Sequence, residues 1–201
     1  MTPWDRHLDG RVLASLRAGG LLSLQAFREV VDGLISDGME EAGLGGEEPT
    51  VDDAPPAVIR HLADRAKARL LTNAYRLTGE LLEELRRCAA CEVVVGIKTL
   101  DVERHRRYTG RPLGPVLRNI SAPVSAGVKT LFGTVLIPGL NGPEDVEGAA
   151  KSLRENLGGA ILMVDPLIPV LGASWRRPTE DELRDATESE EICGCEDPYR
   201  G

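Results

Sequence analysis

The sequence has 201 residues, of which 42% are apolar and 28% charged, a composition typical of a globular domain with one hydrophobic core. Its formal charge of −8 argues against a nucleic-acid partner, because phosphate binding needs a basic surface. The apolar runs are far shorter than the roughly 20 residues that cross a bilayer, and the first ten residues lack the apolar segment of a signal peptide. We therefore expect a cytoplasmic protein with no nucleic-acid or membrane partner.

Helices and strands are predicted to alternate in the first half of the chain. Apolar residues at helical spacing predict helices over residues 23–37, 57–68 and 79–88. Apolar and β-branched runs predict strands over residues 69–72 and 92–98. Ser23 is the expected N-cap of the first helix, and residues 43–50 are expected to form a turn-rich loop.

The second half continues the alternation. Further helices are predicted over residues 113–123, 143–157 and 178–187. Further strands are predicted over residues 128–138 and 159–165. Pro143 opens one of these helices, and Thr179 with Glu182 forms a capping-box pattern at the start of another. Alternating elements indicate a parallel α/β sheet, and about five strands are too few to close an eight-stranded barrel.

The elements divide the chain into three parts. Residues 1–22 form an N-terminal segment, residues 23–187 form the domain, and residues 188–201 form a polar, loosely packed tail. Because ligands bind beyond the carboxyl ends of parallel strands, the segments that follow the strands are expected to meet at one edge of the sheet. Each of these segments taken alone is also consistent with an ordinary turn or a solvated charge.

Four motifs in chain order carry a resemblance to a known family. They are Gly45-Gly46-Glu47-Glu48-Pro49-Thr50, Leu71-Thr72-Asn73-Ala74, the segment from Gly96-Ile97-Lys98 to His105 and Thr109-Gly110, and Pro138-Gly139-Leu140-Asn141. Together they resemble the radical S-adenosylmethionine (radical SAM) superfamily, and most of all the activating enzymes of glycyl-radical proteins, such as the pyruvate formate-lyase activating enzyme. The resemblance extends over residues 23–187.

The resemblance implies a fold and a chemistry. The fold would be α/β, an incomplete parallel (β/α) barrel of the radical SAM type that lacks the first strand. The cofactors would be S-adenosylmethionine (SAM) and a [4Fe-4S] cluster. Such an oxidoreductase cleaves SAM reductively and generates a radical on a partner, here a glycyl-radical-type protein or a small substrate, and it needs an electron donor.

The resemblance also implies roles for individual residues. Gly45, Gly46 and either Glu47 or Glu48 would hold the amino group of SAM, Asn73 would line its pocket, and Lys98 would lie near its carboxylate and ribose. Ala74 stands where the family usually has glycine, and Gly96 stands where close relatives have an acid. The roles implied for His105, Thr109 and Gly110 are mainly structural, and Asn141 follows its turn in the usual place.

The cluster motif of the family, Cys-x3-Cys-x2-Cys, is not found in residues 1–22, where it is expected. Three explanations are open. The chain starts late and the motif lies upstream of Met1, or the chain is a degenerate, non-catalytic homologue that acts as a binding or partner subunit, or other cysteines replace the motif. Whether the protein is an enzyme depends on which explanation holds.

Four cysteines occur in two close pairs, Cys88 with Cys91 and Cys193 with Cys195. Both pairs are expected at the amino edge of the sheet, opposite the SAM pocket. They could form a four-thiolate zinc or iron-sulfur site, and a buried Cys88 is equally well explained as a small apolar residue.

Overall fold

One sheet of six parallel strands organises the part of the chain that the structure describes. The computed structural model describes residues 23–45, 48–158, 160–169, 172, 174–188 and 192–194. The strands are β1 (Glu41–Leu44), β2 (Lys67–Thr72), β3 (Cys91–Gly96), β4 (Lys129–Leu136), β5 (Leu162–Pro166) and β6 (Ile192–Gly194). They lie side by side in chain order, and every neighbouring pair is parallel. Each connection must therefore cross over one face of the sheet.

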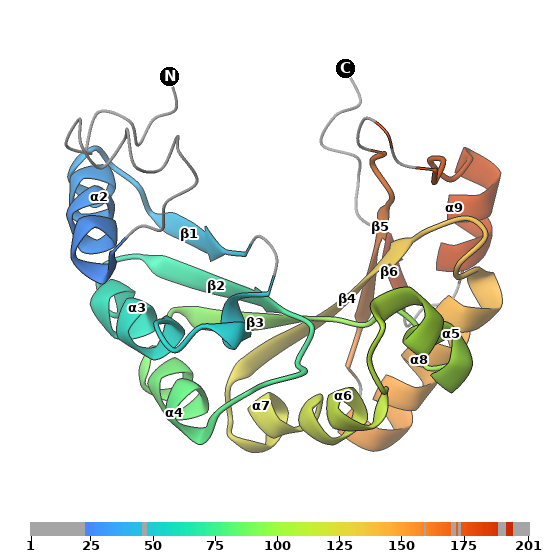
Figure 1. Ribbon diagram of the computed structural model, residues 1–201, viewed down its shortest axis with the longest axis horizontal. Helices are drawn as coiled ribbons and strands as arrows, with labels where there is room; N and C mark the ends of the chain where they lie inside the picture. The colour runs from blue at the N-terminus through green and yellow to red at the C-terminus, as the bar shows by residue number, and fades with distance from the viewer. Residues whose placement is uncertain are drawn as a thin grey trace.

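One helix precedes β1, and the other helices occupy these connections. They are α2 (Leu24–Ser36), α3 (Pro55–Leu62), α4 (Gly79–Arg87), α5 (Val102–Thr109), α6 (Gly114–Asn119), α7 (Ala122–Ser125), α8 (Pro143–Leu157) and α9 (Glu180–Thr187). Figure 1 shows them around the convex side of a curved sheet whose two ends do not meet. Among the described strands, β1 and β6 are the outermost and do not pair with each other. The predicted incomplete α/β barrel is therefore confirmed.

Two predicted helix starts are confirmed by their hydrogen bonds. The Ser23 side chain accepts a hydrogen bond from the backbone nitrogen of Ala26 at 3.1 Å, which caps α2. Thr179 and Glu182 form the predicted capping box at the start of α9. The Thr179 hydroxyl accepts from the Glu182 nitrogen at 3.2 Å, and the Glu182 carboxylate accepts from the Thr179 nitrogen at 2.8 Å.

Three elements differ from the prediction. Strand β1 lies partly in the segment predicted to be a loop, and its half-exposed sequence gives no apolar run because pairing with β2 is what stabilises it. Strand β6 lies in the predicted loose tail, where Ile192 is buried against the core. Helix α5 was not predicted, since His105 is its one buried residue and no apolar stripe marks it.

The two faces of the sheet carry different side chains, because successive residues of a strand point to opposite faces. The face toward the helices is fully buried and includes Ala68, Leu70, Val93, Val95 and Leu162. The concave face is layered along the strands. Arg69, Glu92 and Lys129 are register partners near the amino ends, and Gly96 and Gly133 are register partners near the carboxyl ends of β3 and β4. The concave face therefore has a row of charged side chains at one end and a pair of glycines toward the other.

Candidate functional site

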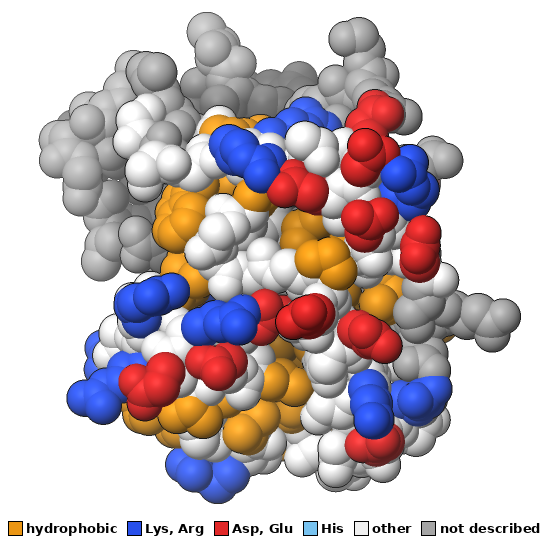
Figure 2. Space-filling view, turned by 90° about the vertical axis from the view of Figure 1, so that its right-hand side faces the viewer, with side chains coloured by type: hydrophobic (Ala, Val, Ile, Leu, Met, Phe, Trp, Pro, Cys, Tyr) orange, Lys and Arg blue, Asp and Glu red, His pale blue; other side chains and the backbone are white. Residues whose placement is uncertain are grey.

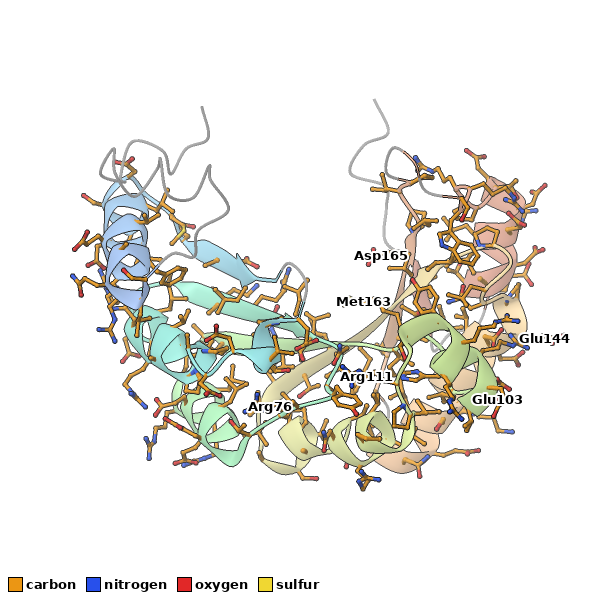
Figure 3. All side chains as sticks on the ribbon, viewed as in Figure 1. Arg76, Glu103, Arg111, Glu144, Met163 and Asp165 are labelled. Carbon is orange, nitrogen blue, oxygen red and sulfur yellow. A yellow bond between two sulfur atoms is a disulfide. The ribbon has the colours of Figure 1, made fainter. Side chains whose placement is uncertain are left out.

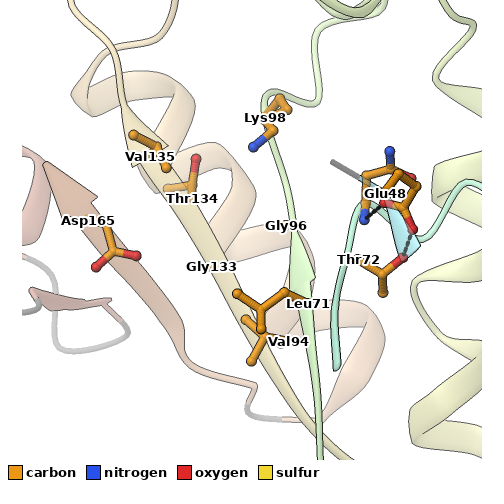
Figure 4. A pocket seen from close by; sticks show the side chains of 11 residues that line it. Glu48, Leu71, Thr72, Val94, Gly96, Lys98, Gly133, Thr134, Val135 and Asp165 are labelled. Atoms are coloured by element: carbon orange, nitrogen blue, oxygen red, sulfur yellow. Dashed lines mark hydrogen bonds between the residues drawn. The ribbon is translucent and has the colours of Figure 1, made fainter. Parts of the chain in front are cut away.

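A cavity of about 300 Å³ lies at the carboxyl ends of the strands. Figure 4 shows the residues that line it, which are Glu48, Leu71, Thr72, Asn73, Val94, Gly96, Lys98, Gly133, Thr134, Val135 and Asp165. A Cβ atom added at Gly96 would lie 3.7 Å from the Thr72 carbonyl oxygen and 3.9 Å from Nζ of Lys98. Because Gly96 and its register partner Gly133 have no side chains, a ligand can lie directly against the backbone of β3 and β4.

Glu48 fastens the segment after β1 to the end of β2. Its Oε1 accepts hydrogen bonds from the Thr50 nitrogen at 3.0 Å, the Thr50 hydroxyl at 2.5 Å and the Thr72 hydroxyl at 2.6 Å. Its Oε2 accepts from the Asn73 nitrogen at 2.6 Å. These bonds make Glu48 the N-cap of the short 3-10 helix η2 (Pro49–Val51). They fix the carboxylate in place and leave Oε2 able to accept one further donor.

Asn73 and Ala74 form the turn after β2. The Asn73 Oδ1 accepts a hydrogen bond from the Tyr75 nitrogen at 2.8 Å, so its side chain oxygen shapes the turn as well as lining the cavity. Ala74 is fully buried and has a φ of 57°, in the left-handed region that favours glycine. This explains physically why a glycine would suit the position. The Asn119 Nδ2 donates to the carbonyl oxygens of Ala74 and Tyr75 at 2.9 and 3.1 Å and holds the turn.

Lys98 supplies a cation to the cavity. Burial lowers the pKa of its ammonium group below the usual 10.5, and the negative charge of Glu48 opposes that shift. The ammonium has no hydrogen bond or ion pair with any residue in the described part of the chain. A partly desolvated ammonium without a protein partner can bind a ligand's carboxylate or hydroxyl.

Asn141 fixes the backbone from which Lys98 projects. Its Nδ2 donates to the Lys98 carbonyl at 3.2 Å and to the Val135 carbonyl at 2.9 Å, and its Oδ1 accepts from the Ile137 nitrogen at 2.7 Å. Asn141 is 6% exposed, so these bonds are protected from water. They join the ends of β3 and β4 and thereby hold the two strands that form the floor of the cavity.

The predicted site residues can now be placed. Glu48, Asn73 and Lys98 line the same cavity. Gly45 follows β1, and a Cβ atom there would lie 3.6 Å from Cβ of Leu71, which lines the cavity. Gly46 and Glu47 lie outside the described residues.

Helix α5 carries the other residues of the third motif. The Thr109 hydroxyl donates to the His105 carbonyl at 2.8 Å, and Gly110 ends the helix with a φ of 70°. These bonds give Thr109 and Gly110 the structural roles that the resemblance implied. The His105 ring is buried beneath them.

Cys88, Cys91 and Cys193 are the cysteines in the described part of the chain. Cys88 and Cys91 lie at the amino edge of the sheet, as expected, but their sulfur atoms form a disulfide, which offers no thiolate to a metal. Cys193 lies on β6, three strands from β3, or roughly 14 Å at the usual strand spacing. Cys195 lies outside the described residues. The residues that are described contain no group of three or more side chains that could hold a metal ion.

Asp165 and Gly133 line the cavity and were not predicted. Asp165 is the register partner of Val135, and Figure 4 shows it across the cavity from Glu48 and Thr72. A single acid near a strand end carries no local signal. Asp165 lies two residues after Met163 and therefore on the same, concave face of the sheet. Only the register of β4 and β5 shows that this places it at the cavity.

The outer surface carries charges of both signs. Figure 2 shows acidic and basic side chains interspersed on the end of the molecule that includes α8 and α9. Ion pairs account for part of this pattern, with Arg176 2.6 Å from Glu182 and Arg184 2.5 Å from Asp181. None of the helices that the structure describes is long and apolar enough to cross a membrane.

Comparison with protein families identifies the class to which this fold and cavity belong. The sequence pattern of the radical SAM superfamily matches residues 8–153. This chain is therefore a member of the radical SAM superfamily, a family that uses SAM and a [4Fe-4S] cluster.

Among curated proteins, the chain is 32% identical to the GTP 3′,8-cyclase of Aeromonas hydrophila over 125 residues, which is 60% of this chain and 36% of that protein. It is 30% identical to the benzylsuccinate synthase activating enzyme of Thauera aromatica over 118 residues, 56% of this chain and 35% of that protein. The chain thus spans little more than a third of the length of these two relatives.

Solved structures share the fold. Streptococcus suis SuiB superposes with a TM-score of 0.69 at 15% identity, covering 80% of this chain and 37% of that one. SuiB bound to SAM gives a TM-score of 0.64 at 17% identity, covering 73% and 34%. A domain of the pyruvate-formate lyase-activating enzyme of Bacteroides vulgatus gives 0.60 at 17% identity, covering 78% of this chain and 99% of that one.

The residues present differ in how they fit the two cofactors of the family. An unpaired ammonium, a carboxylate with spare acceptor capacity and a glycine floor suit a ligand that joins an amino acid to a flat nucleoside. A [4Fe-4S] cluster needs several cysteine thiolates beside the cavity. Residues 1–22 contain no cysteine, and Cys88 and Cys91 lie at the opposite edge of the sheet in a disulfide. The residues that the structure describes therefore fit SAM but not the cluster.

Proposed function

We propose that the cavity at the carboxyl ends of β2 to β5 binds SAM. The observation that carries this proposal is the ammonium of Lys98, which projects over the Gly96 floor without a partner among the described residues. Lys98 would bind the carboxylate or ribose of SAM, and Glu48 or Glu47 would accept hydrogen bonds from its amino group. Asn73 and Gly45 would line the pocket with Gly46.

The protein residues would bind and orient SAM. Glu48 is held by four protein donors, so its carboxylate does not have to be ordered when the ligand arrives, and Asn141 fixes the backbone from which Lys98 projects. The register-paired glycines would let the nucleoside lie against the strands and exclude water from one of its faces. SAM supplies a deoxyadenosyl radical when its sulfonium group is cleaved reductively.

We further propose that the chain is part of a radical SAM protein of the activating-enzyme type. It would generate a radical on a partner protein or a small substrate, with electrons from a separate donor. Similarity to the benzylsuccinate synthase activating enzyme supports this direction, and similarity to GTP 3′,8-cyclases supports a small substrate equally. The cluster ligands would come from cysteines upstream of Met1. The alternative is a degenerate homologue that binds SAM without cleaving it.

Calorimetric titration of the full chain with SAM tests the binding proposal. Wild type is expected to bind one SAM per chain. Gly96→Val places methyl groups in the cavity and should weaken binding about tenfold or more, because the valine occupies space that the ligand needs. Gly43→Val is the matched control, since Gly43 is a strand glycine on β1 that does not line the cavity. Absence of SAM binding by wild type, or equal loss in both variants, would contradict the proposal.

The coding frame upstream of Met1 distinguishes a catalytic radical SAM protein from a homologue that binds SAM without cleaving it. An in-frame Cys-x3-Cys-x2-Cys motif is expected if the protein is catalytic. Its product, reconstituted with iron and sulfide and then reduced, should release 5′-deoxyadenosine from SAM. A stop codon close to Met1 would contradict the catalytic reading and favour the SAM-binding homologue.

A further inference from the structure

A second cavity, of about 390 Å³, adjoins the first. It shares Glu48, Asn73, Gly96 and Lys98 with the first cavity and extends away from Asp165 toward α5 and α6. Its walls come from η2, the connection between β2 and α4, and the residues between β3 and α6. Its volume lies in the range of small-molecule sites.

His105 is one of the residues that line this second cavity, and its ring has an unused polar atom. The residue is 5% exposed, and its Nδ1 is buried with no hydrogen-bond partner in the described structure. Burial lowers the pKa of the ring, and a hydrogen bond with the Thr99 backbone opposes that shift. A neutral imidazole has one acceptor nitrogen, and a buried ring nitrogen left without a hydrogen-bond partner is costly.

Two cations with unused donors line the same cavity. The Arg111 guanidinium lies 5.9 Å from the centre of the Tyr75 ring, and this stacking leaves its N–H groups without a hydrogen-bond acceptor among the described residues. Lys98 is the second such cation and lines both cavities. Figure 3 shows Arg76 and Arg111 coming from two different connections to this region, and both residues line the cavity.

The remaining charges of the cavity are already paired. Arg76 donates to the Val51 carbonyl at 3.1 Å and to Asp53 at 3.2 Å. Glu48 is the one carboxylate among the lining residues, and four protein donors hold it. Arg76, Lys98 and Arg111 thus outnumber the single carboxylate of Glu48 among the lining residues, which makes the second cavity complementary to negative charge.

We propose that the second cavity binds a small organic carboxylate that also carries a hydroxyl or N–H group. The carboxylate would pair with Arg111, and the hydroxyl or N–H would donate to Nδ1 of His105. Lys98, at the junction of the two cavities, would face this ligand on one side and SAM on the other. That the carboxylate is the substrate of a radical reaction rests on the proposed function, whereas its binding does not.

Lactate and propionate are matched probes, because they differ in the hydroxyl group that the proposal requires. The full chain, labelled with ¹⁵N-histidine, is titrated with each, and the Nδ1 resonance of His105 is followed by NMR. Lactate is expected to shift this resonance and to saturate at millimolar concentration. Propionate should bind roughly 3- to 10-fold more weakly, since it lacks the hydrogen bond to Nδ1.

Arg111→Gln tests the anion contact at an exposed residue, where folding is not at risk. It should weaken lactate binding about tenfold, because a charge-assisted hydrogen bond is lost, and should leave SAM affinity within about twofold of wild type. Arg106→Gln is the matched control, since Arg106 is an exposed arginine of α5 that does not line the cavity.

Three results would overturn the proposal. They are no shift of His105 with either probe, equal affinity for lactate and propionate, or loss of SAM affinity in Arg111→Gln, which would make this cavity part of the SAM site. Lactate binding is measured without SAM. A failure of wild type to bind SAM would therefore contradict the proposed function but not the binding of lactate in the second cavity.

Discussion

The two ends of the same sheet treat charge in opposite ways. At the amino end, the Glu92 carboxylate is 1% exposed and is contacted by Arg69 at 2.5 Å, Lys129 at 2.7 Å and Lys67 at 3.7 Å. Burial alone would raise the pKa of Glu92, but hydrogen bonds from Lys129 and Arg69 outweigh it and bring the pKa to about 2. At the carboxyl end, the Lys98 ammonium has no such partner in the described chain.

This difference indicates that the charges at the amino end stabilise the fold and that the charge at the carboxyl end serves ligand binding. A buried charge with partners contributes to the folded state, whereas a partly buried charge without partners lowers stability and is kept where a ligand supplies the partner. The carboxyl end also has glycines where the amino end has charged side chains. The amino end therefore holds the strands together, and the carboxyl end is left open for ligands.

The largest expected change in stability is at Glu92. Glu92→Gln removes the buried negative charge and should lower the free energy of unfolding at neutral pH by about 2 kcal/mol. This figure is below the value that the pKa shift implies, because Arg69 and Lys129 are 38% and 64% exposed and water screens them. Urea denaturation measures the change. Glu41→Gln, an exposed acid at the same end, should change stability by less than about 0.5 kcal/mol.

The pH dependence sharpens the same prediction. The pKa of Glu92 is depressed in the folded state from the usual 4.5 to about 2, so its contribution is present above pH 4.5 and is lost as the pH falls toward 2. Wild type should therefore lose more stability than Glu92→Gln between these two values. Parallel stability profiles of the two proteins over this range would show that the paired charge does not stabilise the fold.

Asn141 links the two ends of the comparison, since it is a buried structural residue that positions a ligand-binding one. Asn141→Ala removes three hydrogen bonds around the Lys98 and Ile137 backbone and should cost about 1–2 kcal/mol of stability, with weaker SAM binding. Asn156→Ala is a control at an exposed helical asparagine, where little change is expected. If Asn141→Ala unfolds at the same urea concentration as wild type, this link is wrong.

The smallest change in the free energy of unfolding is expected for Lys98→Met. Replacing a partly desolvated, unpaired ammonium by an apolar chain should leave the free energy of unfolding unchanged or raise it by up to about 1 kcal/mol. A clear loss of stability, measured by thermal unfolding, would mean that Lys98 has a structural partner after all.

The sequence predicted the central strands and most of the helices, α5 excepted, because their signals are local. Ser23 and Thr179 cap helices through contacts within one turn, and the run Val93–Val95 marks β3. Strands β1 and β6 escaped prediction because each forms only through pairing with a neighbour distant in sequence. Glu48, Asn73 and Lys98 were singled out because they belong to motifs that occur in the family's order. Each motif follows a strand, so these residues lie at the same edge of the sheet.

The rest of the site depends on contacts that no local pattern encodes. Asp165 lines the first cavity through the register of β4 and β5, and His105 lines the second beside residues of η2 and of the connection between β2 and α4. The order of the strands also places Cys91 on β3 three strands from Cys193 on β6. Spacing along the chain could not reveal that order.

The most direct test of the central claim is the SAM affinity of Lys98→Met beside that of wild type and of Lys151→Met, an exposed lysine of α8. Lys98→Met should bind SAM roughly 10- to 100-fold more weakly, the usual loss for a hydrogen bond to a charged group, with Lys151→Met unchanged. Equal SAM affinity in all three proteins would contradict the assignment of the carboxyl end as the ligand site.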